Sequence, residues 1–170
     1  LVTPFKKDLS IDYDALARII ESIIAGGVEF LVALGTTAET PTLSASEKRE
    51  VLDFIIRQNN KRLPLVVGIG GNHTQEVINT IATYPLGDID AILSVVPYYN
   101  RPGQEAISQH FKAIALSTEK AIILYNVPSR TATNMTAATT LRLAKDFKNI
   151  IAIKEACGSI PQCMELMECV

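Results

Sequence analysis

Residues 121–156, with the sequence AIILYNVPSRTATNMTAATTLRLAKDFKNIIAIKEA, decide the fold class. They contain two short apolar runs, 121–124 and 150–153, on either side of a segment in which apolar residues recur at helical spacing. Both runs are apolar at successive positions, as is typical of strands that are covered on both faces. A strand, a helix and a second strand in this order predict two parallel strands joined by a helical crossover.

The same unit recurs about every thirty residues along the rest of the chain. Two helix starts are marked by capping residues, Asp12 and the capping-box spacing Ser44-x-x-Glu47. Strands that alternate with helices in this way predict a parallel sheet. Further strands are expected at 30–34, 64–69 and 91–95, and further helices at 74–82, 104–115 and 136–144, with a last helix from near Pro161.

Two parallel folds compete for this pattern. An open doubly wound sheet would place a glycine-rich phosphate loop after an early strand, but Gly68-x-Gly70-Gly71 lacks the required spacing and a P-loop lysine. The sequence therefore predicts an α/β fold of the TIM (β/α)8 barrel type. Because such a barrel needs about 250 residues, we expect residues 1–170 to form a truncated portion of it, from the end of strand 1 to helix 6. This partial catalytic domain would lack the last strands and a C-terminal helical region.

The composition excludes several classes of protein. The chain has 16 basic and 18 acidic residues, and its net charge of -2 leaves no large positive field for nucleic acid or an anionic membrane surface. Its apolar runs are shorter than the roughly 20 residues that a bilayer requires. Residues 1–8 lack the residue order of a secretory signal. We therefore expect a cytoplasmic protein without nucleic-acid or membrane partners.

The cysteines are three in number and lie at equal spacings of six residues, at Cys157, Cys163 and Cys169. An odd number argues against a disulfide framework, and residues six apart on a helix lie on different faces. The histidines are distant in sequence, so zinc lacks a fourth ligand. We expect these cysteines to be reduced, small apolar residues and expect no metal site.

In a parallel barrel the active site forms at the carboxyl ends of the strands, and Lys154 ends the apolar run 150–153. Burial there favours the neutral amine, which can attack a carbonyl and form a Schiff base. The alternative is a lysine that pairs with Glu155 or another carboxylate. Position alone does not decide between the two interpretations.

Hydroxyl groups follow neighbouring strands. Tyr125 ends the strand before that of Lys154, and Tyr99 and Thr36 could extend a proton relay from it. The Gly35 to Thr37 turn offers N–H groups and hydroxyls to a carboxylate, and Arg130 could hold a second carboxylate. Each residue also has a structural alternative: a packing tyrosine, a capped turn or a surface arginine.

Four motifs resemble, in order and spacing, the dihydrodipicolinate synthase and N-acetylneuraminate lyase family of pyruvate-dependent class I aldolases. They are Gly35-Thr36-Thr37-x-Glu39, Tyr98-Tyr99-Asn100-Arg101-Pro102, the stretch YNVPSRT at 125–131, and Ile153-Lys154-Glu155-Ala156. The resemblance implies a lysine imine with pyruvate and neither a metal nor an organic cofactor. It assigns the imine to Lys154, the proton relay to Tyr125, Thr36 and Tyr99, and the pyruvate carboxylate to Thr37. Tyr99 would come from a neighbouring subunit of a homotetramer, a dimer of dimers.

Within the family, Arg130 in the sequence Asn-Val-Pro-Ser-Arg-Thr resembles the synthase branch. The resemblance implies condensation of pyruvate with L-aspartate 4-semialdehyde in lysine and diaminopimelate biosynthesis. One alternative is an N-acetylneuraminate lyase or another pyruvate-dependent sugar-acid aldolase. A second is an inactive relative that binds a metabolite.

This chain departs from the family pattern at two glycine positions, which are occupied by Ala38 and Ala132. If either position requires positive φ, alanine costs roughly 1 kcal/mol there. Some family members bind lysine as an inhibitor in an interface cleft, and the resemblance places Asn72, Glu76 and Tyr98 among its polar residues. Where lysine-sensitive members often carry histidines, this chain has Ala45 and Lys48, so we expect weak inhibition or none.

Overall fold

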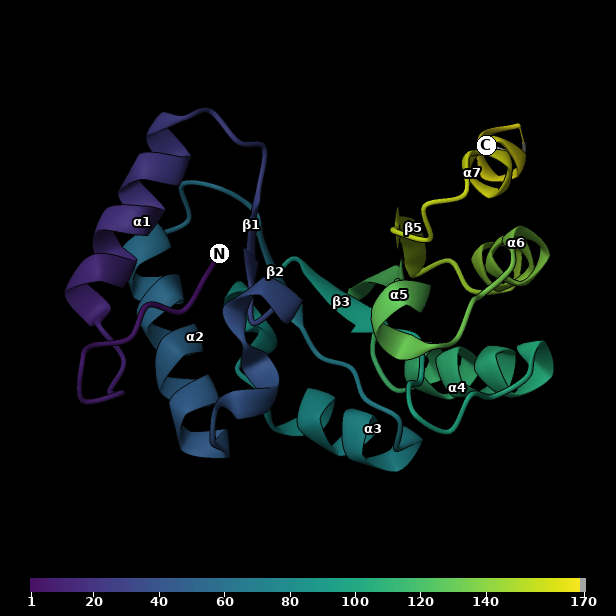
Figure 1. Cartoon of the computed structure of the whole chain (residues 1–170), viewed down its shortest axis with the longest axis horizontal. Coiled ribbons are helices and arrows are strands. Elements are labelled where there is room, and N and C mark those ends of the chain that lie inside the picture. The colour runs from purple at the N-terminus through teal and green to yellow at the C-terminus, as the bar shows by residue number, and fades with distance from the viewer. Residues whose placement is uncertain (169–170) are drawn as a thin grey trace. The chain divides into compact units, whose positions relative to one another are not determined.

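The computed structural model describes residues 1–168, which divide into two compact units. The first unit consists of Leu1–Gly68 and Pro85–Asp90. The second consists of Ile69–Tyr84 and of the chain from Ala91 onward. Each unit contains parallel strands and the helices that connect or flank them (Figure 1).

The first unit pairs β1 with β2 in parallel, with Leu31 opposite Leu65. Helices α1 and α2 pack against each other, as Figure 1 shows. The core is made of apolar side chains that are almost completely buried, among them Leu16 and Leu52. In chain order the elements are α1 (Tyr13–Ala25), β1 (Leu31–Ala33), the 3-10 helices η1 (Thr36–Ala38) and η2 (Thr40–Thr42), α2 (Ala45–Asn59), β2 (Leu65–Gly68) and the 3-10 helix η3 (Leu86–Asp88).

Both predicted helix starts in this unit are confirmed. The Asp12 carboxylate accepts a hydrogen bond from the Ala15 backbone N–H at 2.9 Å. Ser44 and Glu47 form a reciprocal capping box, in which the Glu47 carboxylate accepts from the Ser44 N–H at 2.8 Å. This bond holds the pKa of Glu47 below its usual range because it favours the ionised form.

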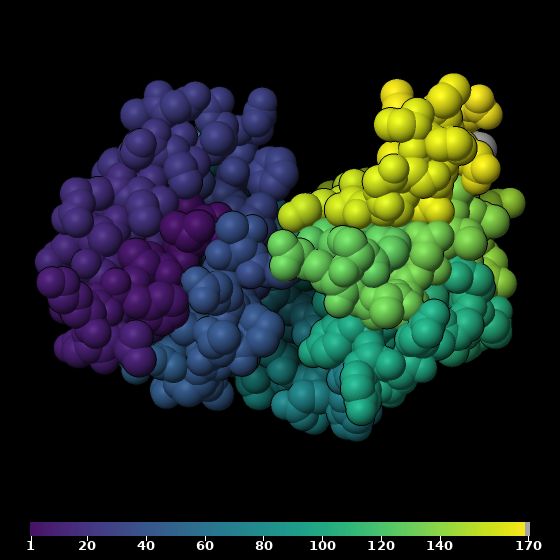
Figure 2. Space-filling model, in the orientation of Figure 1, coloured from purple at the N-terminus to yellow at the C-terminus, as the bar shows by residue number. Residues whose placement is uncertain are grey.

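The second unit contains three parallel strands, β3, β4 and β5, which pair in chain order. Helix α6 packs against α4, α7 and β5, and α7 lies at the C-terminal, yellow end of the unit (Figures 1 and 2). Phe111 and Ile122 are among its fully buried core residues. The elements are α3 (Thr74–Thr83), β3 (Ala91–Val95), α4 (Gln104–Leu116), β4 (Ala121–Asn126), α5 (Pro128–Thr131), α6 (Ala137–Asp146), β5 (Ile150–Glu155) and α7 (Ile160–Met167).

The predicted alternation of strands and helices is confirmed, with differences at the element ends. Strand β4 extends two residues beyond the expected 121–124, and β5 extends two beyond 150–153. Tyr125 and Lys154 therefore lie inside paired strands rather than after them. The short helix α5 was not expected, although Pro128 fits its first turn because proline has no N–H to satisfy there.

Candidate active site

Lys154 and Tyr125 lie side by side on neighbouring parallel strands. The register pairs Tyr125 of β4 with Lys154 of β5, and the Lys154 Nζ lies 4.5 Å from the centroid of the Tyr125 ring. Tyr125 is only 6% exposed. A cation over a tyrosine ring contributes about 0.5–1 kcal/mol at an exposed site, so this contact orients the amine beside the tyrosine.

The expected burial of Lys154 is not found in the described residues. The side chain is exposed, because β5 pairs only with β4 in this part of the chain. Lys154 also makes no ion pair with Glu155 among residues 1–168, where the Glu155 oxygens accept hydrogen bonds from other groups. Among the described residues, Lys154 therefore has the neighbouring tyrosine that the Schiff-base interpretation expects. It does not have the carboxylate partner that the alternative expects.

Tyr98 and Tyr99 follow β3 in an exposed turn. Tyr99 is 87% exposed and has φ 72°, and Arg101 in the same turn also has positive φ. A bulky residue rarely adopts this left-handed conformation, which costs roughly 1–2 kcal/mol. The turn therefore holds the Tyr99 side chain away from the body of its own unit.

Arg130 lies on α5, five residues beyond Tyr125, and its side chain is exposed. It makes no ion pair with the residues described, so its guanidinium is available to a ligand. Helix α5 ends at Ala132, which has φ 55° and ψ 20°. Of the two alanines at family glycine positions, Ala132 thus has the costly conformation.

Thr36 and Thr37 lie in the first unit, on the 3-10 helix η1 that follows β1. Both side chains are exposed, and Gly35 begins the turn in an extended conformation. Ala38 ends η1 as a buried residue without positive φ, and its carbonyl accepts from the Thr3 hydroxyl at 2.8 Å. Alanine is therefore unstrained at position 38.

The residues of the expected lysine cleft come from both units. Lys48 lies on α2 of the first unit and is half-buried. Asn72, Glu76 and Tyr98 belong to the second unit, with Glu76 in the first turn of α3 and exposed.

Sequence reasoning missed a polar cluster on the other face of β4 and β5, formed by the buried Asn126, the half-buried Glu155 and Gln162, and the exposed Asn134. Asn126 donates to both Glu155 oxygens, and Gln162 donates to Glu155 Oε2 at 2.9 Å. Asn134 donates to Gln162 Oε1 at 2.8 Å. A signal was available, because Asn126 and Glu155 each directly follow a predicted site residue and are polar residues in otherwise apolar strands.

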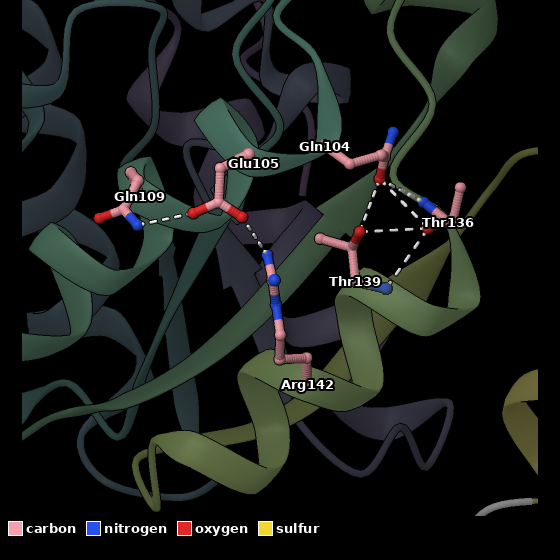
Figure 3. A network of polar contacts seen from close by, with 6 residues as sticks. All are labelled: Gln104, Glu105, Gln109, Thr136, Thr139 and Arg142. Carbon is pink, nitrogen blue, oxygen red and sulfur yellow. Dashed lines mark hydrogen bonds and ion pairs between the residues drawn. The ribbon is translucent and has the colours of Figure 1, made fainter.

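A second network fixes the segment that leads from α5 into α6 (Figure 3). Gln104 Oε1 accepts from the Thr136 N–H at 3.0 Å and from the Thr139 hydroxyl at 2.8 Å. Gln104 also donates to the backbone carbonyl of Asn134 at 2.7 Å. At the edge of this network Arg142 pairs with Glu105 at 3.0 Å. The network thereby anchors Asn134, which belongs to the polar cluster around Asn126.

Other candidate features lie elsewhere in the molecule. A cleft of about 570 Å³ in the first unit is lined by the end of α2 and the residues leading into β2. It lies at the start of a strand, whereas the predicted reacting groups lie at or after the carboxyl ends of strands. Among residues 1–168, no group of three His, Cys, Asp or Glu side chains could hold a metal ion.

Cys157 and Cys163 are free, half-buried thiols, and Cys169 lies outside the described residues. Burial raises the pKa of Cys157, which favours its protonated thiol. None of the helices in the described part of the chain is long and apolar enough to cross a membrane.

The profile of the dihydrodipicolinate synthetase family matches residues 1–170. A curated relative from Flavobacterium psychrophilum, named 4-hydroxy-tetrahydrodipicolinate synthase, is 58% identical over 168 residues. The alignment covers 99% of this chain and 57% of that relative. The chain therefore spans little more than half the length of this relative.

Two solved structures support the same relationship. A dihydrodipicolinate synthase from Acinetobacter baumannii, solved with pyruvate, is 45% identical with a TM-score of 0.93, covering 99% of this chain and 57% of that one. A monomeric dihydrodipicolinate synthase variant is 34% identical with a TM-score of 0.94, covering 99% and 56%. These structures confirm the predicted fold class, a portion of a (β/α)8 barrel.

Proposed function

Because the chain belongs to the dihydrodipicolinate synthetase family, we propose that the protein condenses pyruvate with L-aspartate 4-semialdehyde. This lyase reaction is that of the 4-hydroxy-tetrahydrodipicolinate synthases, in lysine and diaminopimelate biosynthesis. The observation that carries the proposal is the amine of Lys154 beside the Tyr125 ring, 4.5 Å from its centroid. Residues 1–170 form part of the catalytic domain, which supplies the nucleophile.

The chemistry begins when the neutral amine of Lys154 attacks the ketone carbon of pyruvate. The carbinolamine loses water to form an imine, and loss of a methyl proton gives an enamine. The enamine carbon attacks the aldehyde, whose oxygen takes up a proton. The substrate's own amino group then replaces Lys154 at the imine carbon and closes the ring. The protonated imine nitrogen accepts the electron pair when the methyl proton leaves and returns it when the enamine carbon attacks the aldehyde, so the reaction needs no metal or organic cofactor.

The other residues move protons and hold carboxylates. Tyr125, with Thr36 and Tyr99, relays protons, since each hydroxyl both donates and accepts a hydrogen bond. Thr37 binds the pyruvate carboxylate. Arg130 binds the carboxylate of aspartate semialdehyde, and its exposed, unpaired guanidinium among the described residues supports this role.

The protein is a cytoplasmic homotetramer, a dimer of dimers, in which Tyr99 reaches the site of a neighbouring subunit. The 87% exposure of Tyr99 and its strained turn support this arrangement, because they present the ring outward.

Trapping the imine tests the proposal. Borohydride added to the full-length protein with pyruvate should leave a stable adduct on the peptide that contains Lys154. Arg130→Ala should lower kcat/KM for aspartate semialdehyde, by an amount equivalent to about 2–4 kcal/mol of transition-state stabilisation. The pyruvate adduct should still form in this variant. An adduct on another lysine contradicts the mechanism, and absence of any adduct favours an inactive metabolite-binding relative. Faster turnover with N-acetylmannosamine than with aspartate semialdehyde identifies a sugar-acid aldolase instead.

Free lysine should inhibit weakly or not at all. The fixed charge of Lys48 repels the two ammonium groups of the ligand, while Asn72, Glu76 and Tyr98 supply its polar contacts. In a coupled assay at limiting pyruvate, we expect half-inhibition above about 1 mM, equivalent to binding weaker than about 4 kcal/mol. Lys48→Ala should lower this concentration, whereas Lys145→Ala on α6 should leave it unchanged. Tight inhibition of the unmodified protein shows that Lys48 does not obstruct the cleft.

A further inference from the structure

The pairing of β4 with β5 is interrupted by one extra residue. Ile122 lies opposite Ile150, but Ile123 lies opposite Ala152, so Ile151 has no partner on β4. Ile151 is 62% exposed. Continued without this bulge, the pairing would place Ile153 opposite Tyr125. The bulge therefore brings Lys154, rather than Ile153, beside the tyrosine.

The register of β5 decides which face of the sheet carries the amine. Successive side chains of a strand point to opposite faces, so a slip of one residue moves every side chain to the other face. In the observed register Lys154 shares a face with Tyr125, while Glu155 shares the opposite face with Asn126. A slip would turn the Lys154 amine away from Tyr125.

The apolar part of β5 does not specify this register. Residues 150–153 are Ile, Ile, Ala and Ile, which present apolar side chains to both faces whether or not the bulge forms. Register is weakly specified where the pattern does not distinguish the two faces. Another interaction is needed to choose the bulged pairing.

The pair formed by Asn126 and Glu155 provides that choice. Asn126 is 0% exposed, and its amide nitrogen lies 3.0 and 3.1 Å from the two Glu155 oxygens. The Asn126 side-chain oxygen accepts from the Met135 N–H at 3.0 Å, which fixes its orientation. Glu155 in turn accepts from the Cys157 N–H at 2.8 Å and from Gln162. Both members are thus held by the surrounding backbone as well as by each other.

We propose that Asn126 and Glu155 are positioning residues that lock β5 in the bulged register and so place Lys154 beside Tyr125. A slip of one residue would bring Lys154 opposite Asn126 and separate the carboxylate from its donors. The buried Asn126 amide would keep its bonds to Asn134 Oδ1 and to the Met135 carbonyl but lose its ionised acceptor, and hydrogen bonds to ionised groups are the stronger ones. The role of Asn126 and Glu155 in catalysis rests on the proposed function of Lys154. Their effect on the register of β5 does not rest on it.

The test compares Glu155→Ala with Glu105→Ala in the full-length protein. Glu105 lies on α4 of the same unit, and its loss removes only exposed contacts with Arg142 and Gln109. Two quantities are measured: the rate of the borohydride-trapped pyruvate adduct, and the residue opposite Tyr125 in a crystal structure of each variant. We expect Glu155→Ala to form the adduct at least about 100-fold more slowly, because a misplacement of only about 1 Å can have that effect and the slip turns the amine to the other face. Glu105→Ala should match the unmodified protein, and in the Glu155→Ala crystal Ile153 should lie opposite Tyr125.

Glu155→Gln provides the second variant, since it keeps one acceptor oxygen for Asn126. It should form the adduct at a rate between those of the unmodified protein and Glu155→Ala, and it serves alone if the alanine variant does not fold. The proposal is overturned if β5 keeps its register in Glu155→Ala, whatever the adduct rate, or, where that variant does not fold, if Glu155→Gln matches the unmodified protein in both register and adduct rate. It is also overturned if the register changes and the rate does not. Where the unmodified protein forms no adduct, a changed register still supports the lock, and the proposed function alone fails.

Discussion

At the scale of single residues, Ala132 is strained by its place at the end of α5. Its left-handed conformation costs alanine about 1 kcal/mol more than glycine. We therefore expect Ala132→Gly to raise the free energy of unfolding by about 0.5–1 kcal/mol, measured by urea denaturation. The matched control is Ala38→Gly on η1, where φ is not positive; it should be destabilising. A loss of stability in Ala132→Gly would contradict the strain.

The buried His110 makes the stability of the protein depend on pH. It is 4% exposed, and burial lowers its pKa to about 4 because the charged ring is poorly solvated there. The Thr74 hydroxyl pairs with Nδ1 at 2.8 Å. The unfolded chain binds the proton more tightly than the folded chain. The contribution of the neutral His110 to the free energy of unfolding is therefore complete above pH 6.5 and is lost as the pH decreases toward 4.

This pH dependence is measurable as a slope in unfolding free energy. The full effect is about 3 kcal/mol, from roughly 2.5 pKa units at 1.36 kcal/mol each. His110→Asn should flatten the slope between pH 4 and 6.5, since asparagine does not titrate. His73→Asn, at the exposed cap of α3, should retain it. Equal slopes in the two variants would assign the effect to other groups.

At the scale of elements, Gly68 allows β2 to approach the chain that follows β1. A Cβ built at Gly68 would lie 2.1 Å from the Leu34 carbonyl oxygen, which is backbone and cannot rotate away. Gly68→Ala should therefore lower the free energy of unfolding by about 1–3 kcal/mol. Gly87→Ala in the same unit meets nothing within 4 Å and should change stability little. Thermal denaturation of both variants measures the contrast, and similar losses in the two would refute the steric explanation.

Local patterns in the sequence were sufficient for the elements but not for the geometry between them. Capping residues and apolar spacing act over a few neighbours, so the helix starts at Asp12 and Ser44 could be predicted. The bulge at Ile151 could not, because it depends on how two strands 28 residues apart pair, as with Ile122 and Ile150. The contact of Lys154 with Tyr125 could be predicted, because the two residues end strands that are consecutive in the chain. The exposure of Lys154 could not be predicted, since it depends on which elements cover β5.

At the scale of the whole molecule, the proposed reach of Tyr99 into a neighbouring subunit would make each active site depend on two chains. Lys154→Ala and Tyr99→Phe should each be nearly inactive alone. Co-expressed with different tags, they should recover about a quarter of the unmodified activity when chains assort at random, because half the pairs are mixed and one of two sites is intact. Steady-state turnover of the co-purified protein measures this recovery.

The control for this experiment combines Lys154→Ala with Tyr125→Phe. Both residues come from the same unit of one chain and lie in contact. A mixed pair then has one intact site only if the two residues act in different subunits, so no recovery is expected here. Recovery in the control but not with Tyr99→Phe would reverse the assignment of residues to subunits.

The unpaired Ile151 also means that β5 can lose a residue without losing the contact between the lysine and the tyrosine. Between the pair Ile122 and Ile150 and the pair Tyr125 and Lys154, β4 contains two residues and β5 contains three. Loss of one residue from this part of β5 would convert the bulge into a regular ladder and leave the lysine beside the tyrosine. Loss of one residue from the facing part of β4 would instead require a second irregularity. A single-residue deletion is thus compatible with the paired lysine and tyrosine on β5 and not on β4, and a single-residue insertion on β4 and not on β5.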